Sequence, residues 1–207
     1  MKDVLIVEDQ RMMRESMENY IRQSGRYRLA ASIANAGLAE SCCERQPVDL
    51  VLMDVCTEND ESGFEATRKI KARFPNIRVI IVTSMLDCGY LSRAREVNAD
   101  SIWFKDASQE ELMNVVDRTM NGESVYPDRT PQVQLGYAGS YEFSEAELRV
   151  LRLLVEGMTY RQMAEALGVS ADTVKAHVSS MLSKTGFTSK TKLAAVVISK
   201  KLIVNGF

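Results

Sequence analysis

Residues 1–120 alternate between short apolar runs and amphipathic segments, and this alternation limits the fold more than any other feature of the chain. Five runs have the length and the branched apolar composition of buried strands, at residues 4–7, 28–33, 48–55, 79–83 and 101–104. Segments with apolar residues at helical spacing follow them, at residues 13–21, 38–45, 64–74, 89–97 and 108–120. Such alternation favours parallel strands joined by right-handed crossovers, so the sequence predicts an α/β fold with a doubly wound, five-stranded parallel sheet.

Polar side chains follow four of these strands. Glu8 and Asp9 come after the first, Asp54 ends the third, Thr83 ends the fourth and Lys105 follows the fifth. A polar residue after a strand is often only the start of a loop, and each of these alone has that simpler explanation. Because all the carboxyl ends of a parallel sheet lie at one edge, the five side chains together are expected to converge there.

The predicted cluster suits phosphoryl transfer. Carboxylates that lie close together repel one another unless a cation is present, and all-oxygen ligands suit Mg²⁺. A lysine and a hydroxyl can bind the same anion as the metal. Asp54 as a nucleophile that forms an aspartyl phosphate beside Mg²⁺ would use every one of these groups.

The pattern changes after residue 120. Glycine and proline punctuate residues 121–141, which we predict to be a linker between a domain of residues 1–120 and a second domain of residues 142–207. The second domain shows capping residues, each followed by a helical apolar pattern, at Ser144, Thr159 and Ser170. A short helix, a turn with Gly168 and a longer helix form a helix-turn-helix, so we expect a smaller all-α domain of four helices.

The outer face of the longer helix is small, polar or basic. With Val174, Val178 and Met181 directed inward, that face holds Thr173, Lys175, Ala176, Ser179, Ser180 and Ser183, with His177 at its edge. Such a face fits closely into a DNA major groove. Taken one at a time, these residues are equally compatible with an ordinary solvated helix surface.

Charge and cysteine content agree with a DNA-binding protein of a reducing compartment. Residues 1–120 hold 16 basic and 20 acidic residues, whereas residues 142–207 hold 9 and 6, so only the second part is basic. Cys42, Cys43, Cys56 and Cys88 form no C-x-x-C pair and read as free thiols. Acids near the N-terminus interrupt any signal-peptide core, and no apolar run has the length of a membrane span. We expect a cytoplasmic protein without membrane contact.

Both parts resemble known families. Residues 1–120 resemble a response-regulator receiver domain, of flavodoxin-like fold, in the motifs VLIVED, VDLVLMD, VIIVTS and ADSIWFKD. The resemblance implies that Asp54 is the phosphoacceptor for a sensor histidine kinase. It further implies a Mg²⁺ site made by Glu8, Asp9, Asp54 and the main-chain carbonyl of Cys56, with Thr83 as the switch hydroxyl and Lys105 on the phosphoryl group.

The second domain resembles the LuxR-type DNA-binding domain, most clearly in ALGVS and TVKAHVSSML. The resemblance implies base or backbone contacts from Lys175 and Ser179 and phosphate contacts from Thr173, Lys184 and Lys190. A last helix over residues 190–204 would mediate dimerisation on an inverted-repeat operator, through Leu193, Val197, Lys201 and Val204. The alternative is that its apolar residues only close the domain's own core.

Receiver and output domain together are the arrangement of the NarL/FixJ response regulators, which are transcription factors rather than enzymes. Three departures stand out: Thr57-Glu58 replaces the family's usual Met-Pro, the loop before Gly63 is one residue longer, and Ile102 replaces a switch aromatic. Cys56 and Met85 offer no acid or amide to orient a hydrolytic water, so we predict a long-lived phosphoryl group.

Two other functions remain open at this point. One is an orphan regulator that binds DNA independently of phosphorylation, which Ile102 and the altered loop favour. The other is an aspartyl-phosphate phosphatase, but its nucleophile belongs after the first strand in a D-x-D pattern, where this chain has VEDQ.

Overall fold

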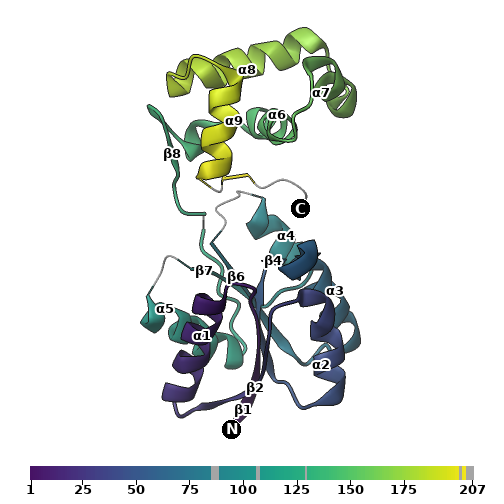
Figure 1. Cartoon of the computed structure of the whole chain (residues 1–207), viewed down its shortest axis with the longest axis vertical. Coiled ribbons are helices and arrows are strands. Elements are labelled where there is room, and N and C mark those ends of the chain that lie inside the picture. The colour runs from purple at the N-terminus through teal and green to yellow at the C-terminus, as the bar shows by residue number, and fades with distance from the viewer. Residues whose placement is uncertain (85–88, 106–107, 129, 201, 204–207) are drawn as a thin grey trace. The chain divides into compact units, whose positions relative to one another are not determined.

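The computed structural model describes residues 1–84, 89–105, 108–128, 130–200 and 202–203 (Figure 1). The chain divides into two compact units, one made of the described residues up to 128 and one of those from 130 onward. No helix among the described residues is long and apolar enough to cross a lipid bilayer.

The N-terminal unit is a five-stranded parallel sheet in the order β2-β1-β3-β6-β7. Its strands are β1 (Lys2–Val7), β2 (Tyr27–Ile33), β3 (Leu50–Asp54), β6 (Arg78–Thr83) and β7 (Ser101–Phe104). Its helices are α1 (Arg11–Gln23), α2 (Ala39–Arg45), α3 (Gly63–Arg73), α4 (Tyr90–Glu96) and α5 (Gln109–Met120), with the short 3-10 turn η1 (Ala36–Leu38) before α2. The predicted fold class is confirmed.

Helices cover both faces of this sheet. In Figure 1, α1 and α5 lie on one side, and α2, α3 and α4 on the other. Val4, Leu52 and Ile80 from the three central strands are wholly buried, and they pack with Ile21 of α1 and Leu112 of α5. The continuous apolar runs therefore reflect strands that are buried on both faces.

A short hairpin that the sequence does not predict follows β3. It consists of β4 (Cys56–Thr57) and β5 (Glu61–Ser62), which pair antiparallel around the turn η2 (Glu58–Asp60). Asn59 and Asp60 in that turn have φ values of 62° and 57°, a left-handed conformation that Asn and Asp tolerate better than most residues. The lengthened loop therefore forms a tight turn beside the end of β3.

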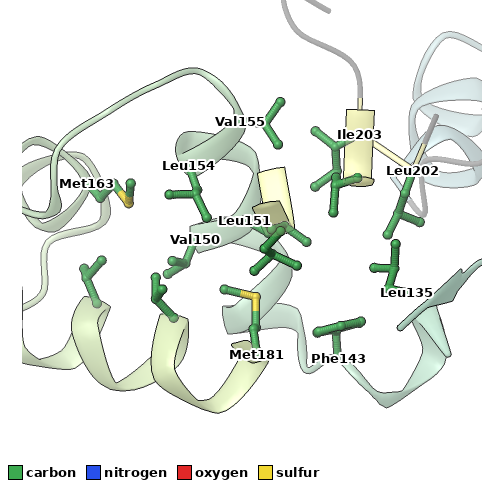
Figure 2. Close-up of a cluster of buried hydrophobic side chains, with 14 of the residues drawn as sticks. Leu135, Phe143, Val150, Leu151, Leu154, Val155, Met163, Met181, Leu202 and Ile203 are labelled. Carbon is green, nitrogen blue, oxygen red and sulfur yellow. The ribbon is translucent and has the colours of Figure 1, made fainter. Parts of the chain in front are cut away.

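The C-terminal unit packs four helices around one apolar core. They are α6 (Glu145–Val155), α7 (Tyr160–Leu167), α8 (Ala171–Thr185) and α9 (Lys190–Ser199), preceded by the turn η3 (Ser140–Glu142). Figure 2 shows side chains of this core, among them Leu151 and Leu154 from α6 and Met181 from α8. Ser144, Thr159 and Ser170 cap α6, α7 and α8, as the sequence predicts.

Parts of residues 121–141, which the sequence predicts to be a linker, pack onto the two units. The Val125 amide donates to the Ser101 hydroxyl of the N-terminal unit at 2.9 Å. Further on, β8 (Gln134–Leu135) and β9 (Ala138–Gly139) form a hairpin in the C-terminal unit. Leu135 and Ala138 are buried in its core, so the break in periodicity over these residues reflects a short hairpin.

The last helix is shorter than the predicted span of residues 190–204, since α9 ends at Ser199. The amide of Leu202 turns back to the Val197 carbonyl at 3.1 Å, and Leu202 and Ile203 are both buried. Burial of these two apolar side chains bends the chain back over the core (Figure 2).

Candidate functional site

The five polar residues predicted at the carboxyl edge of the sheet lie where the parallel strands place them. Glu8 follows β1, Asp54 ends β3, Thr83 ends β6 and Lys105 follows β7. Glu8 and Thr83 are wholly buried, and Asp54 is 6% exposed. The Lys105 ammonium lies 2.6 Å from Glu8 Oε2 and 2.8 Å from Asp54 Oδ2. The backbone amide of Lys105 also donates to the Thr83 carbonyl at 2.9 Å, which continues the β6–β7 pairing.

One lysine does not balance the acids around it. Burial and the neighbouring charge of Asp54 raise the pKa of Glu8 to about 7, despite Lys105. Burial likewise raises the pKa of Asp54, against the opposing effect of Lys105. Burial would lower the pKa of Lys105, but the charges of Asp54 and Glu8 outweigh it and raise that pKa. The site therefore favours one more positive charge.

Three carboxylates are arranged to hold that charge. Glu8, Asp9 and Asp54 each offer an oxygen, and these oxygens all lie within 4.8 Å of one another. An all-oxygen set of this kind, open on the side of the exposed Asp9, suits Mg²⁺. The residues present therefore fit the predicted metal.

Arg14 and Gly63, for which the sequence predicts no role, stabilise the geometry of this site. The Arg14 guanidinium donates to the Glu8 carbonyl at 2.6 Å and to the Asp9 carbonyl at 3.3 Å, fixing the turn after β1. Gly63 begins α3 against the backbone of Asp54, where a Cβ atom would lie 1.8 Å from the Asp54 carbonyl oxygen. Its amide donates to the Val55 carbonyl at 2.8 Å. Only glycine fits this contact.

The hairpin after β3 is tied to the loop before α2. The Thr57 hydroxyl accepts from the Ala36 amide at 2.9 Å, and Asn35 donates to the Glu58 carbonyl at 3.0 Å. Cys56 is half-buried, and burial together with the charges of Asp54 and Asp9 raises the pKa of its thiol to about 12. The thiol is therefore neutral; a metal contact from the Cys56 carbonyl stays a prediction.

The two residues before the end of β7 point to opposite faces of the sheet. Trp103 packs in the core beneath α1 and α5, and Ile102, 2% exposed, takes the opposite face. Ile102 is thus buried at the place of the family's switch aromatic. Met85 and Cys88 lie outside the described residues.

The candidate DNA-binding face lies on α8. Gly168 ends α7 in the left-handed conformation with φ 65°, and α8 begins three residues later, which gives a helix-turn-helix. Val174, Val178 and Met181 are buried, as predicted. On the outer face, Thr173, Lys175, Ala176 and Ser179 are exposed, while His177 and Ser180 are half-buried.

Lys184 and Ser180 bind within the unit instead of lying open on that face. The Lys184 ammonium lies 2.8 and 2.9 Å from the two carboxylate oxygens of Glu147, and it donates to the Glu142 carbonyl at 2.8 Å. The Ser180 hydroxyl donates to Glu147 at 2.8 Å. Burial would raise the pKa of Glu147, but these bonds and one from the Ser144 amide lower it to about 2. Lys184 thus has a structural partner, which differs from the predicted phosphate contact.

The residues predicted for dimerisation fall into two groups. Leu193 and Val197 are wholly buried in the core of their own unit, which favours the alternative that they close that core. Lys201 and Val204 lie outside the described residues. Lys190 is exposed at the start of α9, and its ammonium lies 4.5 Å from the centre of the Tyr160 ring.

Two family models match this chain. The response regulator receiver domain matches residues 4–117, and the luxR family of bacterial regulatory proteins matches residues 142–197. The chain belongs to the response regulators. This response regulator joins a receiver to a LuxR-type DNA-binding domain, as its motifs predict.

Relatives and solved structures agree with that assignment. The response regulator is 30% identical to Response regulator protein VraR of Staphylococcus aureus over 208 residues, which cover 97% of this chain and 98% of VraR. A crystal structure of a LuxR-family DNA-binding response regulator from Staphylococcus aureus is 29% identical with a TM-score of 0.55, covering 58% of this chain and 100% of the other. A structure of two RcsB dimers bound to two parallel DNAs has a TM-score of 0.65 at 18% identity, covering 96% and 98%. This last likeness shows the fold alone.

Proposed function

We propose that this response regulator accepts a phosphoryl group on Asp54 from a sensor histidine kinase and thereby controls its binding to DNA. The observation that carries the proposal is the buried cluster in which Lys105 lies within 3 Å of both Glu8 and Asp54 (2.6 and 2.8 Å). The carboxylate of Asp54 attacks the phosphorus of a phosphohistidine, the P–N bond breaks, and the imidazole leaves with the electron pair. In this proposal Asp54 is the nucleophile, and the charges beside it at the edge of the sheet support the transfer electrostatically.

Each neighbour of Asp54 has a role in this step. Lys105 stays beside the new phosphoryl oxygens as a point charge, and we expect the hydroxyl of Thr83, at the end of β6, to donate to one of them. Glu8, Asp9 and Asp54 would hold Mg²⁺, together with the Cys56 carbonyl. Bound there, the metal supplies charge neutralisation for the transferring group. The buried position keeps bulk water away from the acyl phosphate.

The proposed DNA binding depends on the outer face of α8. Thr173, Lys175, Ala176 and Ser179 are exposed on it and present methyl, hydroxyl and ammonium groups to a major groove. His177, half-buried, lies at its edge, and Lys190 offers a positive charge for the phosphate backbone. We expect the regulator to bind an inverted-repeat operator as a homodimer, as the RcsB dimers bind DNA, through surfaces other than Leu193 and Val197.

Intact-mass measurement after incubation with acetyl phosphate and Mg²⁺ tests the phosphoacceptor. The wild type and the control Asp60→Asn, changed in the exposed turn beside the site, should each gain one phosphoryl group. Asp54→Asn should gain none. Because the Cys56 thiol is neutral and cannot act as a base, we expect the group to persist for hours once acetyl phosphate is removed. Equal labelling of Asp54→Asn would overturn the assignment.

A second candidate function, regulation without phosphorylation, is favoured by Ile102. A buried isoleucine cannot reproduce the rotamer change of a switch aromatic, so a phosphate on Asp54 would need another route to the output. The two candidates differ in whether DNA affinity depends on the state of Asp54.

A further inference from the structure

The hairpin β8–β9 holds an exposed tyrosine firmly against the end of the recognition helix α8. The Tyr137 amide donates to the Thr185 carbonyl at 3.1 Å, and a Cβ atom on Gly136 would lie 2.0 Å from the same oxygen. Leu135 and Ala138 on either side are buried in the core. The backbone of Tyr137 is therefore fixed relative to α8, and Figure 1 shows β8 rising toward this end of the unit.

The side chain of Tyr137 is nonetheless 86% exposed. Its ring lies over Gly186, where a Cβ atom would be 2.4 Å from Cε2 and 2.5 Å from Cδ2. Its hydroxyl makes no hydrogen bond with any residue that the structure describes. An aromatic ring in a fixed place with an unused donor in solvent is suited to binding something outside the chain.

The backbone that this ring covers lies on the DNA-facing side of α8. Gly186, the C-cap of α8, follows Lys175 by 11 residues, and a helical advance of 100° per residue brings its Cα atom to within about 20° of the direction of the Lys175 Cα atom. Ser179 lies between them on the same stripe. The separation along the axis is about 16 Å, more than the width of about 12 Å of a major groove. When Lys175 reaches the base edges, Tyr137 stands at the groove's rim, where phosphates lie.

The surroundings of that rim favour an anion. The turn after Gly186 leads into the N-terminus of α9, which Ser189 caps and which has no acid in its first turn. The Phe187 ring lies beside the hairpin, 3.1 Å from the position of a Cβ atom on Gly136, and the Lys192 ammonium lies 5.6 Å from the centre of that ring. A lysine near a helix N-terminus attracts phosphate.

We propose that Tyr137 is a further DNA-contacting residue, whose hydroxyl donates to one backbone phosphate at the far end of the recognition helix. This inference rests on the proposed DNA binding through α8. Because a phosphate carries no sequence information, the contact strengthens binding and sets the orientation of α8, and it does not select bases.

The test compares full-length wild type and Tyr137→Phe on a duplex selected from a random pool by the wild-type protein. Phenylalanine keeps the ring over Gly186 and removes only the hydroxyl. We expect about tenfold weaker binding, the usual value of a hydrogen bond to a charged group, with an unchanged unfolding midpoint and base preference. Tyr141→Phe is the control, because the Tyr141 hydroxyl donates inside the unit to the Thr130 carbonyl; it should bind like the wild type.

Single methylphosphonate substitutions along the duplex then locate the contact. At one phosphate, the neutral group should weaken the wild type and leave Tyr137→Phe unaffected, so that the two proteins bind equally. Equal affinity of both proteins on the unmodified duplex would overturn the inference and leave DNA binding through α8 intact. Failure of the wild type to select any duplex would overturn the proposed function itself.

Discussion

The buried carboxylate of Glu147 holds the helix α8 in place. It accepts hydrogen bonds from Lys184 and Ser180 of α8 while it lies in the first turn of α6. Glu147→Gln should lower the free energy of unfolding by about 2 kcal/mol at neutral pH, because a charged acceptor is lost while the Lys184 ammonium stays. Glu145→Gln, in the same turn but 84% exposed, should change it by less than about 0.5 kcal/mol.

The effect of Glu147 should also depend on pH. Its pKa is lowered from 4.5 to about 2 in the folded state, so the ionised form stabilises the fold above about pH 4.5. That contribution is lost as the pH falls through about 2. Chemical denaturation at several pH values should show the difference between wild type and Glu147→Gln shrinking below about pH 4. A difference that stays constant to acid pH would contradict this role.

For single residues, the sequence predicts which side chains meet at the strand ends, but it does not predict hydrogen-bond partners that lie far apart in the chain. Glu8, Asp54, Thr83 and Lys105 could be predicted to converge because a parallel sheet brings its carboxyl ends to one edge. The partner of Lys184 could not be predicted, since Glu147 lies 37 residues away on another helix and only packing brings them together.

At the scale of elements, Gly63 couples α3 to the strand that carries Asp54. A methyl group there would meet the Asp54 carbonyl oxygen at 1.8 Å, so α3 or β3 would have to move. Gly63→Ala should lower the free energy of unfolding by about 3 kcal/mol and slow phosphorylation by acetyl phosphate. Denaturant unfolding and intact mass measure the two effects.

Gly25→Ala is the matched control for this change. Gly25 has φ +63° but nothing within 4 Å of a Cβ atom, so only backbone strain of about 1 kcal/mol is expected and phosphorylation should be normal. Equal effects of the two substitutions would show that contact with Asp54 is not what requires glycine at residue 63.

The regular elements could be predicted from the sequence, whereas the short ones could not. Five apolar runs and three capped helices give clear periodic signals. The hairpins β4–β5 and β8–β9 have strands of two residues, too short for any period, and they are stabilised by contacts such as that of Thr57 with Ala36. α9 ends at Ser199, and burial of Leu202 and Ile203 turns the chain back there. In the sequence, apolar residues at helical spacing continue beyond Ser199, so this end could not be predicted.

At the scale of the whole molecule, the chain joins an acidic receiver to a basic DNA-binding unit. Residues 121–141 take part in the packing of both, through Val125 on one side and Leu135 on the other. A phosphoryl group on Asp54 adds negative charge to a site already short of cations, which favours any receiver state that brings Thr83 and Lys105 closer to it. Control of DNA binding requires that the two receiver states differ in their effect on the output unit.

The most direct test is the affinity of the full-length protein for its selected duplex with and without beryllofluoride, a phosphomimetic, in the presence of Mg²⁺. Wild type should bind at least about tenfold more tightly with beryllofluoride, a coupling typical of two linked sites. Asp54→Ala should bind weakly in both conditions, and Asp60→Asn should follow the wild type. Equal affinity of wild type and Asp54→Ala, with no response to beryllofluoride, would contradict phosphorylation control and identify a regulator that binds DNA independently of its receiver.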